Sequence, residues 1–276
     1  MLIGAHESIA GGVSQAFGRA LEHRAQSMQI FTRSARGWTA PVLPEAECRA
    51  FKAEARRTGV AVIAHGSYLA NLATDDPRLR KHSIAAVVDE LTRCERLGVP
   101  FLVLHPGSHP DERRGLSQVA RGLDAVHART RGFAAKVCLE VTAGQGASLG
   151  WKFEHLAEIL DQVKDEGRVG CCLDTCHLYA AGHDFAGRAG YAKVLAHFDR
   201  VVGLSRVKCF HLNDCKKPLG CRVDRHEEIG RGTLGRAAFG PWVKDARFRR
   251  LVGVLETPKP ENYRKSIGLL LSLAKR

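Results

Sequence analysis

The sequence lacks any apolar run near the roughly 18 residues that a membrane-spanning helix needs, so we expect no transmembrane segment. Its first residues, MLIGAHESIAGG, lack the basic start and long apolar region of a secretory signal, and we therefore expect an intracellular, cytoplasmic protein. No Pro- or Ser-rich linker, low-complexity tract or repeated block divides the 276 residues. One domain over residues 1–276 is the expectation for such a chain.

Cysteine pairs of the CxxC type are also absent, although the sequence contains nine cysteines. This absence argues against a thiolate zinc site. Most of the cysteines stand singly in apolar stretches, as Cys138 does in KVCLEV and Cys209 in VKCFHL. We therefore expect small buried side chains that an intracellular compartment keeps reduced.

Acidic residues are too few to balance the basic ones. Lys and Arg number 42 against 29 Asp and Glu, which gives a formal net charge of +13. Such a charge favours a polyanion such as nucleic acid as partner. Basic proteins that merely resist aggregation are also common, so the charge alone leaves both alternatives open.

Short apolar or β-branched runs recur along the whole chain and alternate with segments of helical periodicity. In residues 77–98 the apolar side chains share one face, Pro77 suits a first turn and Gly98 suits a stop. The other predicted helices are residues 44–58, 115–131, 152–166, 189–202 and 261–274. The predicted strands lie in MLIGAH, SMQIFT, VAVIAHG, FLVLHPG, KVCLEV, VGCCLDT, RVKCFHLND and RLVGVLET. Eight such units predict an α/β fold of the closed (β/α)8 TIM-barrel type rather than an open doubly wound sheet.

Six consecutive predicted strands, the third to the eighth, end in a side chain that can bind a metal. These residues are His65, His105, Glu140, Asp174, His211 and Glu256. The carboxyl ends of all strands meet at one face of a TIM barrel, where active sites are built, so these side chains should converge. Any one of them alone could be a capping or satisfied core residue. Burying all six without a counter-charge would cost several kcal/mol each, and metal ions would supply that charge.

Two further segments add metal-capable side chains. LDTCH places His177 three residues after Asp174, and RVDRHEEIG carries Asp224 and His226, which point the same way from an extended backbone. By itself RVDRHEEIG is also typical of a solvated charged turn. The whole set of five histidines and four carboxylates exceeds what one ion needs and indicates two or three ions. Imidazole and carboxylate ligands suit zinc, with manganese or iron as alternatives.

At these residues the sequence resembles endonuclease IV, the zinc-dependent apurinic/apyrimidinic (AP) endonuclease family. The resemblance spans nearly the whole chain and rests on GAHESIAGG, AHGSYLANLA, HPGSH, LEVTAGQGASLG, LDTCHLYAAGHDF, HLNDCKKPLGCRVDRHEEIGRG and LETPKP. It implies a (β/α)8 barrel that repairs DNA by hydrolysing the phosphodiester 5′ to abasic sites in duplex DNA, leaving a 3′-hydroxyl. Repair of 3′-blocked ends by the same chemistry and a monomeric state are further implications.

The resemblance also implies roles for particular residues. Three zinc ions would be held by His65, His105 and Glu140, by Glu140, Asp174, His211 and Glu256, and by His177, Asp224 and His226. Glu140 and Glu256 would be catalytic. Arg36, Tyr68 and Leu69 resemble the residues with which the family enters the minor groove of DNA. The chain departs from the family at Cys215, where serine is common. A thiol so near the metal face is open to oxidation or adventitious metal binding, and the same holds for Cys221.

Two other classes of protein fit part of the pattern. A metal-dependent sugar isomerase on a related barrel would use Glu140, Asp174, His211 and Glu256, but it needs neither His177 nor the loop with Asp224 and His226. A DNA-binding protein without catalysis would be expected to have lost some of the ligands, and none is lost. Both classes therefore account for less of the sequence than a nuclease does.

Overall fold

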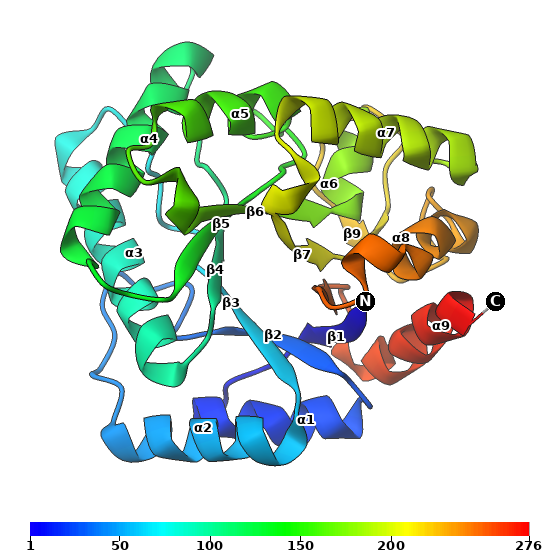
Figure 1. Ribbon diagram of the computed structural model, residues 1–276, viewed down its shortest axis with the longest axis horizontal. Helices are drawn as coiled ribbons and strands as arrows, with labels where there is room; N and C mark the ends of the chain where they lie inside the picture. The colour runs from blue at the N-terminus through cyan, green and yellow to red at the C-terminus, as the bar shows by residue number, and fades with distance from the viewer. Residues whose placement is uncertain (276) are drawn as a thin grey trace.

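Eight parallel strands close into a barrel in the computed structural model, which describes residues 1–275 (Figure 1). The order around the ring is β1-β10-β7-β6-β5-β4-β3-β2. The strands are β1 (Leu2–His6), β2 (Ser27–Phe31), β3 (Ala61–His65), β4 (Phe101–Leu104), β5 (Lys136–Glu140), β6 (Val169–Asp174), β7 (Val207–His211) and β10 (Val252–Leu255). The predicted TIM barrel is confirmed, and each strand falls within its predicted run.

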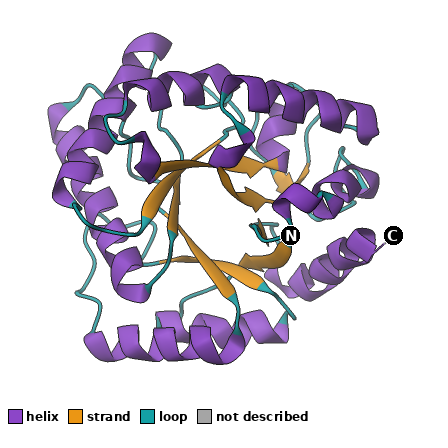
Figure 2. Ribbon diagram, in the orientation of Figure 1, coloured by secondary structure: helices purple, strands orange, loops and turns teal. Residues whose placement is uncertain are grey.

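Helices surround the ring of strands on the outside (Figure 2). Six of them match the predicted segments: α2 (Glu45–Thr58), α3 (Pro77–Leu97), α4 (Glu112–Arg129), α5 (Phe153–Gln162), α7 (Gly187–Val201) and α9 (Tyr263–Lys275). Helix α5 ends earlier than predicted because Val163 is extended, and a 3-10 turn, Glu166–Arg168, follows. Three short helices were not predicted: α1 (Ala16–Glu22), α6 (Thr175–Ala180) and α8 (Gly240–Lys244). The remaining 3-10 turns are Val13–Gln15, Leu204–Arg206, Arg236–Phe239, Ala246–Phe248 and Pro260–Asn262.

Helix α3 shows how local chemistry sets the boundaries of an element. The Asp76 carboxylate accepts hydrogen bonds from the backbone N–H groups of Arg78 and Leu79, and Pro77 follows it at the first helical position. The helix stops at Gly98, whose φ of 75° is left-handed and suits a residue without a Cβ. The start and stop predicted from Pro77 and Gly98 are therefore confirmed.

The barrel closes where β1 pairs with β10, the last barrel strand along the chain, with Leu2 opposite Val252 and Ala5 opposite Leu255. On the other side of β1, a Cβ on Gly4 would lie 1.5 Å from the carbonyl oxygen of Ser27, so only glycine lets β1 approach β2 this closely. The barrel interior below the carboxyl ends is apolar and includes Ile63, Val103, Cys138, Cys172, Cys209 and Val254.

All nine cysteines are free thiols, and all but Cys221 are buried. Burial raises the pKa of the Cys138 thiol well above its ordinary value. The expectation of small buried side chains is confirmed for Cys138 and Cys209. A thiol held neutral in this way is a poor nucleophile and a poor metal ligand.

A two-stranded antiparallel sheet follows β7 and shapes the loop that carries RVDRHEEIG. Its strands are β8 (Asp214–Cys215) and β9 (His226–Glu227), with Cys215 opposite His226. The backbone N–H of Lys216 also donates to the carbonyl of Arg225. The segment is therefore fastened back onto the barrel rather than extended into solvent. None of the helices in residues 1–275 has the length and apolar character to cross a membrane.

Candidate metal centre

The six predicted strand-end residues lie at the carboxyl face of the barrel. His65, Glu140, Asp174 and His211 are the last residues of β3, β5, β6 and β7, while His105 and Glu256 directly follow β4 and β10. Glu140, Asp174 and His211 have no exposed surface, and His65 is only 4% exposed. The barrel thus brings together residues that are far apart in sequence and buries most of them in one cluster.

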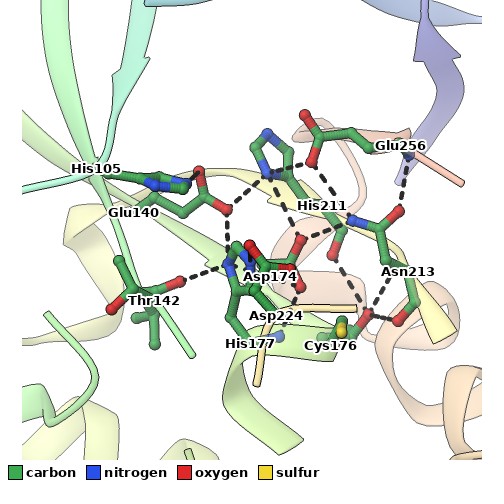
Figure 3. A network of polar contacts seen from close by, with 12 residues as sticks. His105, Glu140, Thr142, Asp174, Cys176, His177, His211, Asn213, Asp224 and Glu256 are labelled. Carbon is green, nitrogen blue, oxygen red and sulfur yellow. Dashed lines mark hydrogen bonds and ion pairs between the residues drawn. The ribbon is translucent and has the colours of Figure 1, made fainter. Parts of the chain in front are cut away.

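The carboxylate of Glu140 lies at the centre of this cluster (Figure 3). Its Oε2 is 3.3 Å from Nε2 of His65 and 3.3 Å from Nε2 of His105. Its Oε1 is 2.9 Å from Nδ1 of His211 and 3.0 Å from Nδ1 of His177. The two oxygens therefore face two separate groups of imidazoles, which is the arrangement expected of a carboxylate that bridges two ions.

A second group surrounds His211. Its Nδ1 lies 3.1 Å from Oε2 of Glu256 and 3.7 Å from Oδ2 of Asp174. One ligand atom from each of four residues, Glu140, Asp174, His211 and Glu256, lies within 4.8 Å of the others. Three carboxylates and one imidazole at this range are a donor set suited to a divalent cation.

The third predicted group is also close together. Nε2 of His177 lies 3.1 Å from Oδ2 of Asp224, and Nε2 of His226 lies 3.4 Å from Oδ1 of Asp224. Asp174 is a further neighbour, since its carboxylate groups with His177 and His226, and the Cys176 thiol groups with Asp224 and His226. The sequence did not indicate that Asp174 and Cys176 lie beside this group.

The ring nitrogens of this third group fit a metal ion better than they fit hydrogen bonds. Nε2 of His177 and Nε2 of His226 are buried and make no hydrogen bond, although carboxylate oxygens of Asp224 lie 3.1 and 3.4 Å away. Buried polar atoms without partners are rare because each one costs free energy. Ligand atoms that face one ion lie close to one another without bonding to one another, so the residues present fit a bound cation.

Electrostatics within the cluster oppose the effect of burial. Burial disfavours the charge on Glu140, but the imidazoles of His211 and His105 outweigh it and hold the pKa of this carboxyl well below its ordinary value. Burial likewise disfavours charge on His211, yet the carboxylates of Glu140 and Glu256 raise its pKa well above the ordinary value. The folded protein therefore keeps carboxylates ionised in a buried site, where a cation is stabilised.

Three polar side chains in contact with the cluster were missed at the level of the sequence: His6, Gln29 and Asn213. Asn213 Nδ2 donates to Asp174 Oδ2 at 2.6 Å, and its Oδ1 accepts from the Glu256 backbone N–H at 2.7 Å. His6 Nδ1 lies 3.7 Å from Glu256 Oε1. A signal for two of them existed, because His6 ends the first strand as the predicted ligands end theirs, and Gln29 interrupts the apolar run SMQIFT.

The predicted DNA-contacting residues lie on two loops beside the cluster. Arg36 is exposed after β2, and Tyr68 is 63% exposed after β3, with its ring 5.5 Å from that of His65. Leu69 is half-buried. Neither Tyr68 nor Leu69 belongs to a helix, because α3 begins only at Pro77. Both residues therefore lie on the loop between β3 and α3.

The two loops are fastened to each other through buried polar groups. The Ser67 hydroxyl donates to the Ala35 carbonyl at 2.7 Å, and the Ser67 backbone N–H donates to Glu90 Oε1 at 3.0 Å. Arg33 Nε lies 3.1 Å from the same Glu90 oxygen, and Arg33 Nη1 donates to the Gly37 carbonyl. Burial raises the pKa of Glu90 to about 7 despite this arginine. The loops with Arg36 and Tyr68 are therefore held as one unit.

Comparison with known proteins agrees with this architecture. A family model described as "Xylose isomerase-like TIM barrel" matches residues 17–273. A D-tagatose 3-epimerase-like protein of known structure shares the fold, with a TM-score of 0.78 and 18% identity over 100% of this chain and 97% of that chain. At that identity the likeness extends to the fold alone.

Two relatives are much more similar. The chain is 49% identical over 277 residues to a protein named "Probable endonuclease 4" of Chloroflexus aurantiacus, covering 98% of this chain and 97% of the relative. The crystal structure of endonuclease IV from Thermus thermophilus superposes with a TM-score of 0.90 at 34% identity, over 100% of this chain and 99% of that one. On the evidence of fold, sequence and full-length coverage, the chain belongs to the endonuclease IV family.

Proposed function

We propose that this protein is a zinc-dependent AP endonuclease of DNA repair that hydrolyses the phosphodiester 5′ to an abasic site in duplex DNA and leaves a 3′-hydroxyl. The observation that carries the proposal is the gathering of Glu140 with eight other histidine and carboxylate side chains in a chain of the endonuclease IV family. The whole chain would act as one domain and as a monomer inside the cell. Removal of 3′-blocking groups would use the same centre.

Three groups of side chains would hold three zinc ions: His65, His105 and Glu140; Glu140, Asp174, His211 and Glu256; and His177, Asp224 and His226. When bound, zinc would lower the pKa of water toward neutrality, and its positive charge would stabilise the phosphoryl group and the leaving oxygen. Glu140 holds the first two groups at a fixed separation, because each of its oxygens faces one of them. Glu256 completes the second group from the last strand of the barrel.

DNA would be bound by the basic surface and distorted by the loops after β2 and β3. The net charge of +13 attracts the phosphate backbone without regard to base sequence. Arg36, Tyr68 and Leu69 would enter the minor groove and occupy the gap left by the missing base. Such wedges unstack DNA at a cost of a few kcal/mol per step, and the cost is lowest where a base is already absent. The abasic site is thereby selected without base contacts.

The first test is the cleavage of a duplex that contains one abasic site. We expect the purified protein to nick the strand that carries the abasic site on the 5′ side of the lesion. It should lose this activity with a zinc chelator and regain it when zinc is restored. An intact duplex of the same sequence is the control. Absence of nicking by zinc-loaded protein would contradict the proposed function, and epimerisation of a ketose instead would favour the sugar-enzyme alternative.

A double variant tests the wedge. Tyr68→Ala with Leu69→Ala should reduce the preference for abasic over intact duplex by about tenfold to a hundredfold, since stacking contacts contribute roughly 1–3 kcal/mol each. Its zinc content should match the parent because neither residue is a predicted ligand. Leu21→Ala truncates a leucine that is 44% exposed on helix α1, and as the control it should leave the preference unchanged. An unchanged preference in the double variant would mean that Tyr68 and Leu69 do not contribute to recognition of the abasic site.

A further inference from the structure

Gln29 is a fully buried amide inside the barrel, on strand β2. Its Nε2 donates to Oε1 of Glu256 at 2.6 Å and lies 3.0 Å from Nδ1 of His6. Its Oε1 lies 2.8 Å from Nε2 of His211. Strand β2 pairs only with β1 and β3 in the ring, so the side chain reaches across the carboxyl end of the barrel to residues of β7 and beyond β10.

The hydrogen bonds fix which end of the amide faces which partner. A carboxylate can only accept, so the group that meets Glu256 must be the NH2 of Gln29. The oxygen of the amide then faces His211 and requires a proton on Nε2 of that ring. With Nε2 committed to the amide, Nδ1 is the nitrogen left to bind a cation, and it faces the carboxylates of Glu140 and Glu256 at 2.9 and 3.1 Å (Figure 3). A cation bound between these groups would take the place of the proton that a charged His211 carries on Nδ1.

We propose that Gln29 is a positioning residue of the metal centre, an inference that rests on the proposed function. It holds His211 in the tautomer whose free nitrogen faces the ion of the second group, and it orients the carboxylate of Glu256 toward the same ion. One side chain thereby aligns two ligands from different strands. Partners that donate to or accept from a metal ligand fix its tautomer and orientation, and their loss typically weakens metal binding about 10- to 100-fold.

The partners of Gln29 distinguish a positioning role from the general need of any buried amide for hydrogen bonds. A buried glutamine needs partners of any kind to avoid an unpaired polar group, and backbone carbonyls would serve. Every polar partner of the Gln29 amide is instead a side chain at the carboxyl face, and two of the three, His211 and Glu256, belong to the second ligand group. The hydrogen bonds of the amide therefore all go to side chains at the candidate metal centre.

The experiment measures zinc binding without DNA. Gln29→Met keeps the length of the side chain and removes both polar atoms, while Gln29→Asn keeps the amide but is one methylene too short to reach both partners. Both variants should bind one zinc ion about 10- to 100-fold more weakly in competition with a chelator. The rise in melting temperature on adding zinc should be smaller than in the parent. Cleavage of abasic duplex should recover when free zinc is raised by the same factor.

A spectroscopic signature and a control complete the test. In the zinc-loaded parent, nitrogen-15 spectra of labelled histidine should show His211 protonated at Nε2, and the Nε2–H resonance should shift or exchange faster in Gln29→Met. Ser27→Ala removes a buried hydroxyl of the same strand that bonds only to backbone carbonyls, and it should keep the parental zinc affinity.

The outcomes are distinct for the two proposals. Parental zinc affinity and an unchanged His211 tautomer in the variants that fold would overturn the role of Gln29. A Ser27→Ala variant with the same loss as Gln29→Met would overturn it as well, because the effect would then come from general destabilisation of β2. A parent that binds zinc but does not nick abasic DNA would contradict the proposed activity and leave the result for Gln29 standing. A parent that binds no zinc would overturn both.

Discussion

Replacement of Glu140 by glutamine should reduce cleavage of abasic duplex by at least roughly 10³-fold while the barrel stays folded. The amide keeps the size of the side chain but removes the negative charge that faces both groups of imidazoles. Loss of the proposed bridging ligand would change the charge at two ions, and about 4 kcal/mol of transition-state stabilisation corresponds to this factor. Cleavage rate, zinc content and thermal unfolding measured on the same preparation would show the effect.

Glu54→Gln is the matched control for this variant. Glu54 pairs with Arg57 on helix α2, outside the predicted ligand set, so the same change of charge should leave the cleavage rate as it is. Glu256→Gln should resemble Glu140→Gln, because both residues belong to the second group. Near-parental rates in a metal-checked Glu140→Gln preparation would remove Glu140 from the chemistry.

Replacement of His226 by alanine should remove one zinc ion and lower cleavage by roughly 10²-fold. His226 lies on the small sheet after β7 rather than on the barrel rim, and its predicted partner Asp224 is on the adjoining loop. The Asp224 side chain is 40% exposed, and exposed loop segments open more easily than the barrel rim, so mild chelation of the parent should also remove this ion first. DNA binding should fall less, since it depends largely on Lys and Arg contacts with phosphate.

Elemental analysis of zinc, the cleavage rate and the affinity for uncleavable abasic duplex would together test the His226→Ala prediction. His197→Ala, on helix α7 beside Glu154, makes the same change outside the centre and should keep the parental zinc content. If His226→Ala holds the parental number of ions and cleaves at the parental rate, the assignment of a third ion is wrong.

The barrel was predictable from the sequence because its long elements carry strong periodic signals. Helix α3 has both a buried face and defined ends, and the strand runs are short, apolar and evenly spaced. The elements that were missed, such as α6 and the β8–β9 sheet, have six residues or fewer. A segment that short does not span enough turns or alternations to show a period, and its structure depends on tertiary contacts.

The site was predictable to the level of its strand-end residues but not of their supporting partners. Residues at strand ends converge whatever their identity, so the proximity of His65, His105 and Glu140 follows from the fold. The hydrogen bonds of Gln29 cross the barrel between strands that are not neighbours. Such contacts depend on side-chain conformations in three dimensions, which the spacing of residues along the sequence does not encode.

The pairing of β1 with β10 has a consequence for synthesis on the ribosome. Strand β1 is made first and its partner β10 near the end, so any sheet that forms before Val252–Leu255 is made would be open, with β1 and β7 as its edges. Unpaired edges are templates for aggregation. Glu256 directly follows β10, so the residue that completes the second ligand group arrives together with closure of the ring. The proposed metal centre can therefore be complete only once β10 and the residue after it have been made.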